Sequence, residues 1–515
     1  MLRKALQRVS SYSPLFPLAC VPHSSWRSQV QRRIQGYANL DDADIQHFKA
    51  VLGDEGNAVE ANQEALEPYN RDWMGIYKGH SKLLLRPGTT EQVSAILRYA
   101  HKKHFAIVPQ GGNTGLVGGS VPVHDEIILS LSRMNKILSF DPASGALVAQ
   151  AGCILQNLDD HVAQYGFIMP LDLGAKGSCQ IGGNISTNAG GLRLLRYGPL
   201  HGSVLGLEVV LADGQVLDLL RTLRKDNTGI HLKHLFIGSE GTLGVVTAVS
   251  IECAPRPSSV QVVFLGLESY AAVTQVLSKA RKMLGEILSA FEFLDAECMR
   301  LSTRFGSVNP LGSAPTSGAG SSQSGQIYPF YVLVETHGSN GAHDREKLDA
   351  FLEAVMADGE ACDGTLAENA HQASQIWKIR EGISEALPRC GAVYKYDVSL
   401  PTPLMHRLVE EVKAQLTQWP GASVLGYGHV GDGNLHLNIV SPEAYPDLKA
   451  KIEPFVFEWV SNAKGSISAE HGLGQMKADA IYHTQSPLAV DVMRSIKRLL
   501  DPQQILNPYK MLPKG

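Results

Sequence analysis

Three glycine-rich runs, each joined to a strand-like segment, constrain the fold of this chain more than any other feature of its sequence. The first spans residues 109–120 and holds five glycines, the second spans 174–191 and holds six, and the third spans 238–244. Glycine permits positive φ angles and lets backbone N–H groups approach an anion closely. One such run is as typical of a loop as of a ligand site. Three together favour a large phosphate-bearing cofactor.

Two other nucleotide motifs can be set aside. No run contains the Gly-Lys-Ser/Thr sequence of a nucleoside-triphosphatase loop. Residues 426–431 match G-x-G-x-x-G, but the alternating pattern of 435–440 predicts a strand where that motif requires a helix. The sequence therefore offers no acceptable nicotinamide site.

The hydrophobic pattern predicts an α+β fold. Short β-rich runs dominate from about residue 126 to 255. Beyond this point, runs 260–267 and 328–336 are typical of strands and enclose a helical stretch at 269–284, which indicates a second α+β domain. From about residue 455 the pattern is helical.

The first forty residues have the composition of a transit peptide. They contain six basic residues, no acidic residue and several serines. A disordered basic tail is the alternative, and the mitochondrial matrix is the simplest destination of a targeted chain. The rest carries 40 basic and 50 acidic residues, so we expect no nucleic-acid partner. No apolar run approaches the length of a membrane span.

A predicted hairpin brings two histidines together. The sequence GDGN at 431–434 is a strong turn signal between two β-like runs. A loop of these four residues places His429 directly opposite His436, with Cβ atoms about 4.5–5.5 Å apart. That separation suits two imidazoles that share a metal ion, and Asn438 lies on the same face.

A third metal ligand is expected from the sequence SAEHGLG. Glu470 would join His429 and His436 in a site that leaves positions open for substrate oxygens. Zinc is the preferred metal, and manganese and ferrous iron remain open. His471 would stay free as a general base.

A third group of residues suits a carboxylate. Arg380 and Ser384 are four residues apart on a predicted helix, and Lys395 follows in a strand-like run. Arginine can bind a carboxylate with two hydrogen bonds, and lysine adds a point charge. Surface ion pairs explain such a pattern more often than a site does, so this group has weight only beside the other two.

With these motifs assembled, the chain resembles the FAD-linked oxidase superfamily related to vanillyl-alcohol oxidase. The resemblance covers nearly all of the chain beyond about residue 60. It depends on PQGGNTGLVGGS, QIGGNISTNAGG, IGSEGTLG, GYGHVGDGNLHLN, SAEHGLG and ILNPYK, which narrow it to FAD-dependent D-2-hydroxyacid dehydrogenases. The segments REGISEAL and VYKYDVSLP are most similar to the mitochondrial D-2-hydroxyglutarate dehydrogenases.

This resemblance implies a division of the chain and a set of site residues. The expected segments are a transit peptide (1–40), an FAD-binding domain of two subdomains (41–256), a substrate-binding domain (257–455) and a C-terminal segment that completes the FAD and metal site (456–515). The residues expected to hold FAD are Pro109, Gly111, Gly112, Asn113, Thr114, Gly115, Gly118, Gly119, Gly182, Gly183, Asn184, Ser186, Thr187, Asn188, Gly241 and Asn507. Those expected to bind zinc are His429, His436 and Glu470, with His471 as base and Arg380, Ser384, Lys395 and Asn438 on the substrate.

Two positions depart from related patterns. Relatives with covalent flavin carry a histidine in the first glycine run, where this chain has Asn113, so FAD should be bound non-covalently. Ser384 stands where threonine is expected, and it still supplies a hydroxyl group.

The implied reaction oxidises D-2-hydroxyglutarate to 2-oxoglutarate, with a hydride passing to flavin N5 and electrons leaving to electron-transfer flavoprotein. Three alternatives stay open: a mitochondrial D-lactate dehydrogenase of the same superfamily, a zinc hydrolase, and a non-catalytic flavin- or metal-carrying interaction module. The hydrolase would leave the three glycine runs without a purpose. The sequence does not decide between a monomer and a homodimer.

Overall fold

The computed structural model describes residues 36–53, 57–311 and 326–513. The predicted transit peptide therefore lies outside the described residues, apart from residues 36–40.

A small mixed sheet leads into the first glycine run. Strands β2, β4 and β3 are parallel, and β1 pairs with β2 in the antiparallel direction. The chain leaves β3 directly as the glycine-rich segment, as the sequence predicts. In spatial order the strands are β1 (Val59–Glu60), β2 (Leu84–Leu85), β4 (Ile127–Ser130) and β3 (Ile107–Gln110). The helices of this part are α2 (Asp42–Leu52), α3 (Gln63–Asn70) and α4 (Thr90–Lys103).

The C-terminal segment extends this sheet at β3. Leu506 forms a parallel bridge with Ile107. The Ile107 N–H group donates to the Ile505 carbonyl oxygen, and the Asn507 N–H group donates to the Ile107 carbonyl oxygen, both at 2.8 Å. This pairing brings Asn507 to the first glycine run.

A five-stranded antiparallel sheet carries the other two glycine runs. The second run contains α6 (Ile181–Thr187). The third run lies between α9 (Lys233–Phe236) and β10 (Val245–Glu252). In spatial order the strands are β5 (Ile137–Asp141), β6 (Ala146–Gln150), β10 (Val245–Glu252), β8 (Val204–Val210) and β9 (Val216–Leu219). A separate pair comprises β7 (Phe167–Ile168) and β11 (Ala254–Pro255). The helices are α5 (Leu155–Ala163), α6 (Ile181–Thr187), α7 (Leu194–Tyr197), α8 (Leu200–Ser203) and α9 (Lys233–Phe236).

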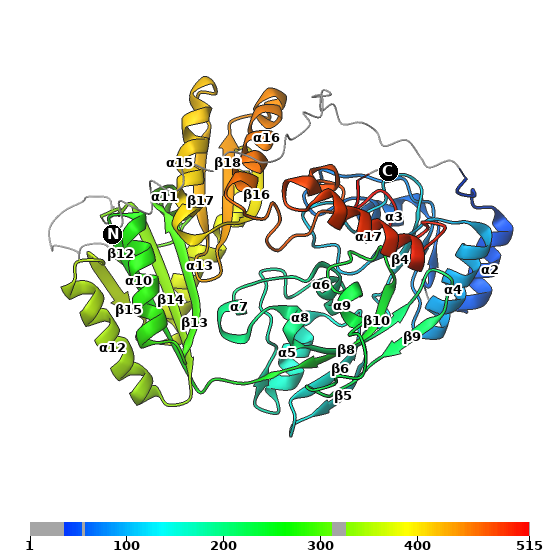
Figure 1. Ribbon diagram of the computed structural model, residues 1–515, viewed down its shortest axis with the longest axis horizontal. Coiled ribbons are helices and arrows are strands. Elements are labelled where there is room, and N and C mark those ends of the chain that lie inside the picture. Colours follow the sequence, from blue (N-terminus) through cyan, green and yellow to red (C-terminus); the bar gives the residue numbers. More distant parts are fainter. Residues whose placement is uncertain (1–35, 54–56, 312–325, 514–515) are drawn as a thin grey trace. The chain divides into compact units, whose positions relative to one another are not determined.

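A seven-stranded antiparallel sheet forms the second half of the chain (Figure 1). In spatial order its strands are β15 (Asp363–Leu366), β12 (Ser259–Leu267), β14 (Phe330–Gly338), β13 (Leu288–Asp295), β17 (Ser423–His429), β18 (Asn434–Ser441) and β16 (Ala392–Ser399). Helices pack on both faces of this sheet, so both faces contribute to the hydrophobic core.

One face is covered by α10 (Tyr270–Met283), α12 (Gly341–Ala357), α15 (Met405–Gln415) and α16 (Pro446–Asn462). The other face is covered by α11 (Ala296–Arg304), α13 (Ala370–Glu381) and α14 (Ile383–Ala386). The chain continues to α17 (Pro487–Leu500) and then to the C-terminal segment. Among the described residues, no helix has both the length and the hydrophobicity needed to cross a membrane. The observed mixture of helices and sheets confirms the predicted α+β class.

Candidate active site

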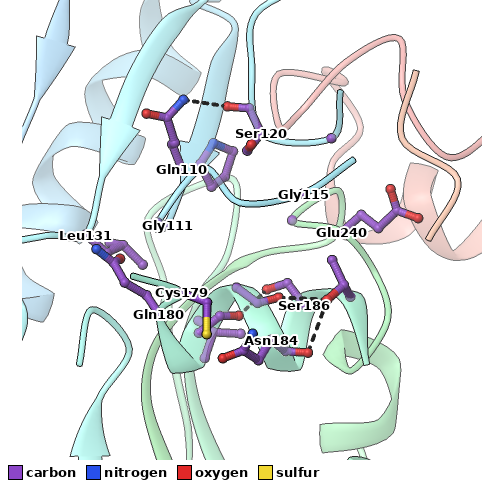
Figure 2. Close-up of a pocket in the computed structure, with 18 of the residues that line it drawn as sticks. Gln110, Gly111, Gly115, Ser120, Leu131, Cys179, Gln180, Asn184, Ser186 and Glu240 are labelled. Carbon is purple, nitrogen blue, oxygen red and sulfur yellow. Dashed lines mark hydrogen bonds between the residues drawn. The ribbon is translucent and has the colours of Figure 1, made fainter. Parts of the chain in front are cut away.

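The three glycine runs converge on one pocket. Figure 2 shows Gly115 of the first run facing Asn184 of α6, with Glu240 of the third run at the side. The first two runs can approach closely only because Gly112 has no side chain: a Cβ atom there would lie 2.1 Å from the Ser178 carbonyl oxygen. Segments that are far apart in the sequence therefore form one backbone-rich cradle.

Most of the predicted cofactor-binding residues line this pocket. They are Pro109, Gly111, Gly112, Asn113, Thr114, Gly115, Gly119, Gly182, Gly183, Asn184, Ser186, Thr187 and Gly241. Three others do not. Gly118 has a φ angle of +69° and packs on Tyr77, and Asn188 ends α6 in a left-handed conformation. Asn507 is buried behind the lining and donates hydrogen bonds to the carbonyl groups of Gly119 and Glu240.

Sequence reasoning missed several residues of the lining. They are Ser120, Leu131, Ala151, Cys179, Gln180, Glu240, Gly244, Val245 and Val246. Most belong to strands or to the residues beside them, where the pattern of a lining residue is the same as that of a core residue. Glu240 had a usable signal, because it is the only acidic residue in the three glycine runs.

The polar groups of the pocket suit a large ligand that carries hydrogen-bond donors. The side-chain oxygens of Gln110, Gln180 and Asn184 are buried and have no hydrogen-bond partner among the described residues. Buried polar atoms normally have partners. At Gly115 and Gly183, a Cβ atom would meet nothing within 4 Å, so the lining leaves open space there. FAD carries hydroxyl groups and a ring N–H group that such oxygens can accept from.

The predicted hairpin forms, but its register differs from the prediction. The turn starts one residue earlier, so His429 pairs with Asn434 and His436 pairs with Tyr427. The buried Asn434 side chain donates to Asp397, which holds this residue in the strand instead of the turn. The predicted direct opposition of the two histidines is therefore wrong. The pairing moves by two residues, which keeps each side chain on its predicted face. The rings still meet diagonally, with Nε2 atoms 3.3 Å apart.

Glu470 lies beside the two imidazoles. Its Oε1 atom lies 3.6 Å from Nε2 of His429, and its Oε2 atom lies 4.0 Å from Nε2 of His436. The Gly191 N–H group donates to Oε1 at 2.7 Å, so the second glycine run also contacts this carboxylate. The structure thus brings all three predicted ligands close enough to share one metal ion.

A buried carboxylate lies directly across a strand from each histidine. Glu292 on β13 pairs with His429, whose Nδ1 atom lies 2.7 Å from the carboxylate. Asp397 on β16 pairs with His436, whose Nδ1 atom lies 3.6 Å from Oδ1. Metal-binding histidines commonly present one ring nitrogen to such a carboxylate and the other to the metal. Sequence reasoning missed both roles, although Glu292 is a single charge within the apolar run 288–294.

Burial and ion pairs set the charges of this group. Burial raises the pKa of Glu292, but His429 and Arg380 lower it to about 2. Burial lowers the pKa of His429, but Glu292 and Glu470 raise it to about 9. Burial and the charge of His429 hold the pKa of His436 well below its ordinary value. The carboxylates therefore stabilise one positive charge on the imidazole pair, and they would stabilise a bound cation in the same way.

His471 lies between this group and the pocket. It belongs to the pocket lining, and its ring is nearly parallel to that of His436, with centroids 6.3 Å apart. Its Nδ1 atom lies 3.5 Å from Oδ2 of Asp397, which leaves Nε2 for a substrate proton. Asp397, Glu470 and His471 form a second group with metal-ligand spacing. The Oδ2 atom of Asp397, however, already accepts the backbone N–H groups of Glu470 and His471.

Arg380 on α13 and Ser384 on α14 both contact the side chain of Tyr427. The Arg380 guanidinium carbon lies 4.6 Å from the centre of the Tyr427 ring, and Oγ of Ser384 lies 2.7 Å from its hydroxyl oxygen. Arg380 is buried, and its Nε–H group donates to Glu292 at 2.9 Å. One edge of the guanidinium is therefore already occupied.

Lys395 is a second cation that could bind a substrate anion. It lies directly across from Asn438, on the face of the sheet that also carries Asp397. Burial lowers the pKa of Lys395. No acidic group among the described residues forms an ion pair with it. A half-buried charge without an ion-pair partner is unfavourable, so this position suits an anionic ligand.

Comparison with known proteins decides the family. Residues 81–220 match the FAD binding domain, and residues 256–511 match the C-terminal domain of FAD linked oxidases. A Bos taurus protein named mitochondrial D-2-hydroxyglutarate dehydrogenase is 56% identical over 513 residues, which cover 97% of this chain and 90% of that protein. The chain belongs to the FAD-linked oxidase family.

Two further relatives of this FAD-linked oxidase show the range of names near it. An Arabidopsis thaliana protein, also named mitochondrial D-2-hydroxyglutarate dehydrogenase, is 55% identical and covers 95% of this chain and 85% of its own. A Schizosaccharomyces pombe protein named putative mitochondrial D-lactate dehydrogenase is 48% identical and covers 92% of this chain and 91% of its own.

Solved structures agree on the fold. p-Cresol methylhydroxylase with substrate bound aligns with a TM-score of 0.71 at 17% identity, over 91% of this chain and 96% of that one. Alkyldihydroxyacetonephosphate synthase aligns with a TM-score of 0.70 at 17% identity, over 93% and 87%. The prediction of a fold of the vanillyl-alcohol oxidase type is confirmed. Membership of an FAD-dependent oxidoreductase family also removes the zinc hydrolase and the non-catalytic module.

Proposed function

We propose that this FAD-linked oxidase converts D-2-hydroxyglutarate to 2-oxoglutarate. The observation that carries the proposal is the position of His471, which lines the cofactor pocket and also lies beside the imidazole pair and Glu470. A hydroxyacid bound at this position would meet a base, a metal site and a hydride acceptor together. The names of the cattle and Arabidopsis relatives supply the substrate class.

FAD would be held non-covalently by the backbone of the glycine runs. When bound, it supplies the acceptor for the hydride of substrate C2. Asn113 braces the first run, because its Nδ2 atom donates to the Arg71 carbonyl oxygen at 2.8 Å and its Oδ1 atom accepts from Ser120 at 2.7 Å. An amide in this role offers no nucleophile for a covalent flavin link.

The metal would be held by His429, His436 and Glu470, with zinc as the first choice. When bound, it would polarise the C2 hydroxyl and the neighbouring C1 carboxylate of the substrate. Glu292 and Asp397 would hold the Nδ1 side of the two rings, which would leave both Nε2 atoms available to bind a metal.

The residues of the chain account for the proton and for the orientation of the substrate. His471 accepts the hydroxyl proton at Nε2 while Asp397 holds its Nδ1 side. The C2 hydroxyl group loses this proton and C2 itself loses a hydride, so the hydroxyacid becomes a 2-oxo acid. Lys395, Arg380 and Ser384 would hold the distal carboxylate, and Asn438 would border the same space from β18.

Replacing Lys395 by alanine should separate two substrates. D-2-hydroxyglutarate loses a charge-assisted hydrogen bond of about 1.5–3 kcal/mol, so kcat/KM should fall about 10- to 100-fold. D-Lactate has no distal carboxylate, so its kcat/KM should hardly change. The exposed Lys378 on α13 provides a matched control, because Lys378→Ala removes a lysine that lies outside this group. Equal losses for both substrates in Lys395→Ala would reject the selectivity role.

D-Lactate oxidation is the second candidate, because the fission yeast relative carries that name. D-Lactate has no distal carboxylate to pair with the ammonium group of Lys395, so it would gain none of the about 1.5–3 kcal/mol that this bond supplies to D-2-hydroxyglutarate. Turnover of the two substrates by the same preparation decides between the candidates. A wild-type kcat/KM for D-lactate equal to that for D-2-hydroxyglutarate would replace the proposed substrate.

Filling the cradle should expel FAD. Gly183→Leu places a side chain where the lining has open space, and leucine is well tolerated in α6. We expect a folded protein that purifies without flavin absorbance. Gly174→Leu is the matched control, because Gly174 belongs to the same run, also has no neighbour within 4 Å and lies outside the lining. Full flavin content in Gly183→Leu would contradict this cofactor position.

We further infer a mitochondrial matrix location and electron-transfer flavoprotein as the acceptor. The acid-free first forty residues and the mitochondrial names of the relatives support the location. The acceptor is supported by the resemblance alone, and reoxidation of the reduced enzyme by purified electron-transfer flavoprotein would test it.

A further inference from the structure

We propose that Glu240 is a positioning residue that fixes the loop carrying the metal ligand Glu470 and the base His471 against the cofactor cradle. The proposal rests on the proposed function, because it assigns Glu240 a role for that same site. We call residues 470–475 the base loop.

The Glu240 carboxylate holds the end of the base loop. It is buried, with 8% of the residue exposed, and it belongs to the pocket lining. One carboxylate oxygen accepts the Leu473 N–H group and the other accepts the Gly474 N–H group, both at 2.7 Å. Two short bonds from successive N–H groups define the place and the direction of this part of the loop.

The backbone of Glu240 is itself fixed to the cradle. Its N–H group donates to the Ser186 carbonyl oxygen of α6 at 2.7 Å. Its carbonyl oxygen accepts from the side chain of Asn507 at 2.6 Å. Its φ angle is +53°, a conformation that few residues other than glycine adopt without local support. Because its backbone is bonded to Ser186 and to Asn507, Glu240 links the base loop to these two segments beside the cofactor pocket.

The base loop packs closely against Glu240 and against the first glycine run. A Cβ atom on Gly472 would lie 2.7 Å from Glu240, and one on Gly474 would lie 2.3 Å from the Val117 carbonyl oxygen of the first glycine run. The Gln475 side chain donates to the Gly118 carbonyl oxygen at 2.9 Å. The loop is thus closely fitted to the same backbone that forms the pocket.

The base lies between two buried carboxylates. Asp397 accepts the N–H groups of Glu470 and His471 at the start of the loop, and Glu240 accepts those of Leu473 and Gly474 at its end. Asp397 attaches the loop to the seven-stranded sheet, and Glu240 attaches it to the lining of the cofactor pocket. Releasing the second attachment should move His471 and Glu470 relative to the cofactor while the sheet-borne ligands stay in place.

The test is Glu240→Gln in the FAD-loaded protein. Glutamine keeps the size of the side chain but has one acceptor oxygen, and its NH₂ group would face one of the two N–H donors. Removing an outer support of this kind commonly costs 10- to 100-fold in metal affinity or activity. We expect a fall of this order in kcat and in Zn²⁺ affinity, little change in KM, and unchanged FAD content, because the backbone bonds of Glu240 persist.

Glu126→Gln is the matched control. Glu126 is also buried, with 3% exposed, and both Glu126 and Glu240 lie near the buried ammonium group of Lys510. Glu126, however, accepts from the His124 N–H group and does not contact the base loop. We expect Zn²⁺ affinity and kcat close to those of the wild type. The Zn²⁺ titration is followed by calorimetry on chelator-treated protein with FAD bound, so it needs no turnover.

Each outcome decides the proposal. Matching values for Glu240→Gln and Glu126→Gln would overturn it, and so would loss of FAD in Glu240→Gln, which would make Glu240 a cofactor support only. If Glu240→Gln does not fold, Glu240→Asp replaces it: the shorter carboxylate should fold and lower kcat, and wild-type values would overturn the proposal. Failure of the wild type to oxidise D-2-hydroxyglutarate would refute the proposed function instead, whatever the Zn²⁺ titrations give.

Discussion

His471→Ala should keep its fold and its yellow flavin colour but reduce that flavin on the order of 10²- to 10⁴-fold more slowly with D-2-hydroxyglutarate. The range is that of a general base removed from a site that keeps its other groups. The ring lies at the border of the pocket, beside the Asp397 carboxylate and the His436 ring, and it is not part of the hydrophobic core. Stopped-flow absorbance under anaerobic conditions measures the reduction directly.

Two observations make this result specific. His231→Ala removes an exposed histidine that stacks on His234, and it should reduce flavin at the wild-type rate. FAD content, measured after denaturation, should be equal in both variants. A His471→Ala protein that reduces flavin at the wild-type rate would remove His471 as the base and leave the role to another group.

Loss of the metal should have an effect of similar size. Charge stabilisation by a bound metal is worth several kcal/mol, so a chelator that removes it should slow turnover at least about 100-fold. Adding Zn²⁺ or Mn²⁺ back should restore the wild type. His436→Ala should be slow from the start and should not recover, because one of the three proposed ligands would be missing. Metal content by elemental analysis accompanies each rate.

The contradicting result is equally clear. A wild-type protein that is free of metal and turns over at its full rate would show that the imidazole pair serves another purpose. The alternative would then be a purely organic site, in which the positive charge on His429 and the neighbouring Arg380 supply the electrostatic stabilisation.

The sequence predicted the position of the hairpin but not its register. The turn signal located the hairpin, and the two-residue period of a strand placed His429 and His436 on the correct face. The exact register depended on the buried Asn434 side chain and its bond to Asp397. That bond joins β18 to β16, and local turn chemistry contains no information about it.

The carboxylates of the site were harder to predict for a related reason. Glu292, Asp397 and Glu240 lie in separate parts of the chain, and each acquires its role only from the residue that folding places opposite it. The strand pattern located the run that carries Asp397, and Glu240 lies in a predicted glycine run, but no strand was predicted at Leu288–Asp295, which carries Glu292. Which residues pair across strands, or across a loop and a cradle, is decided by tertiary packing.

The glycine runs were the most informative signal because their function is carried by the backbone. Thirteen of the sixteen residues expected to hold FAD line one pocket. Gly118, Asn188 and Asn507 instead support that lining from behind or end the helix beside it. Glycine serves both purposes, contact with a ligand and close packing of chain segments, and the sequence alone does not distinguish them.

The most direct test of the account is anaerobic mixing of the FAD-loaded wild-type protein with D-2-hydroxyglutarate. The account predicts that the oxidised flavin absorbance disappears and that 2-oxoglutarate forms in equal amount to the reduced flavin. An unchanged flavin spectrum with D-2-hydroxyglutarate, in protein that carries both FAD and metal, would contradict it.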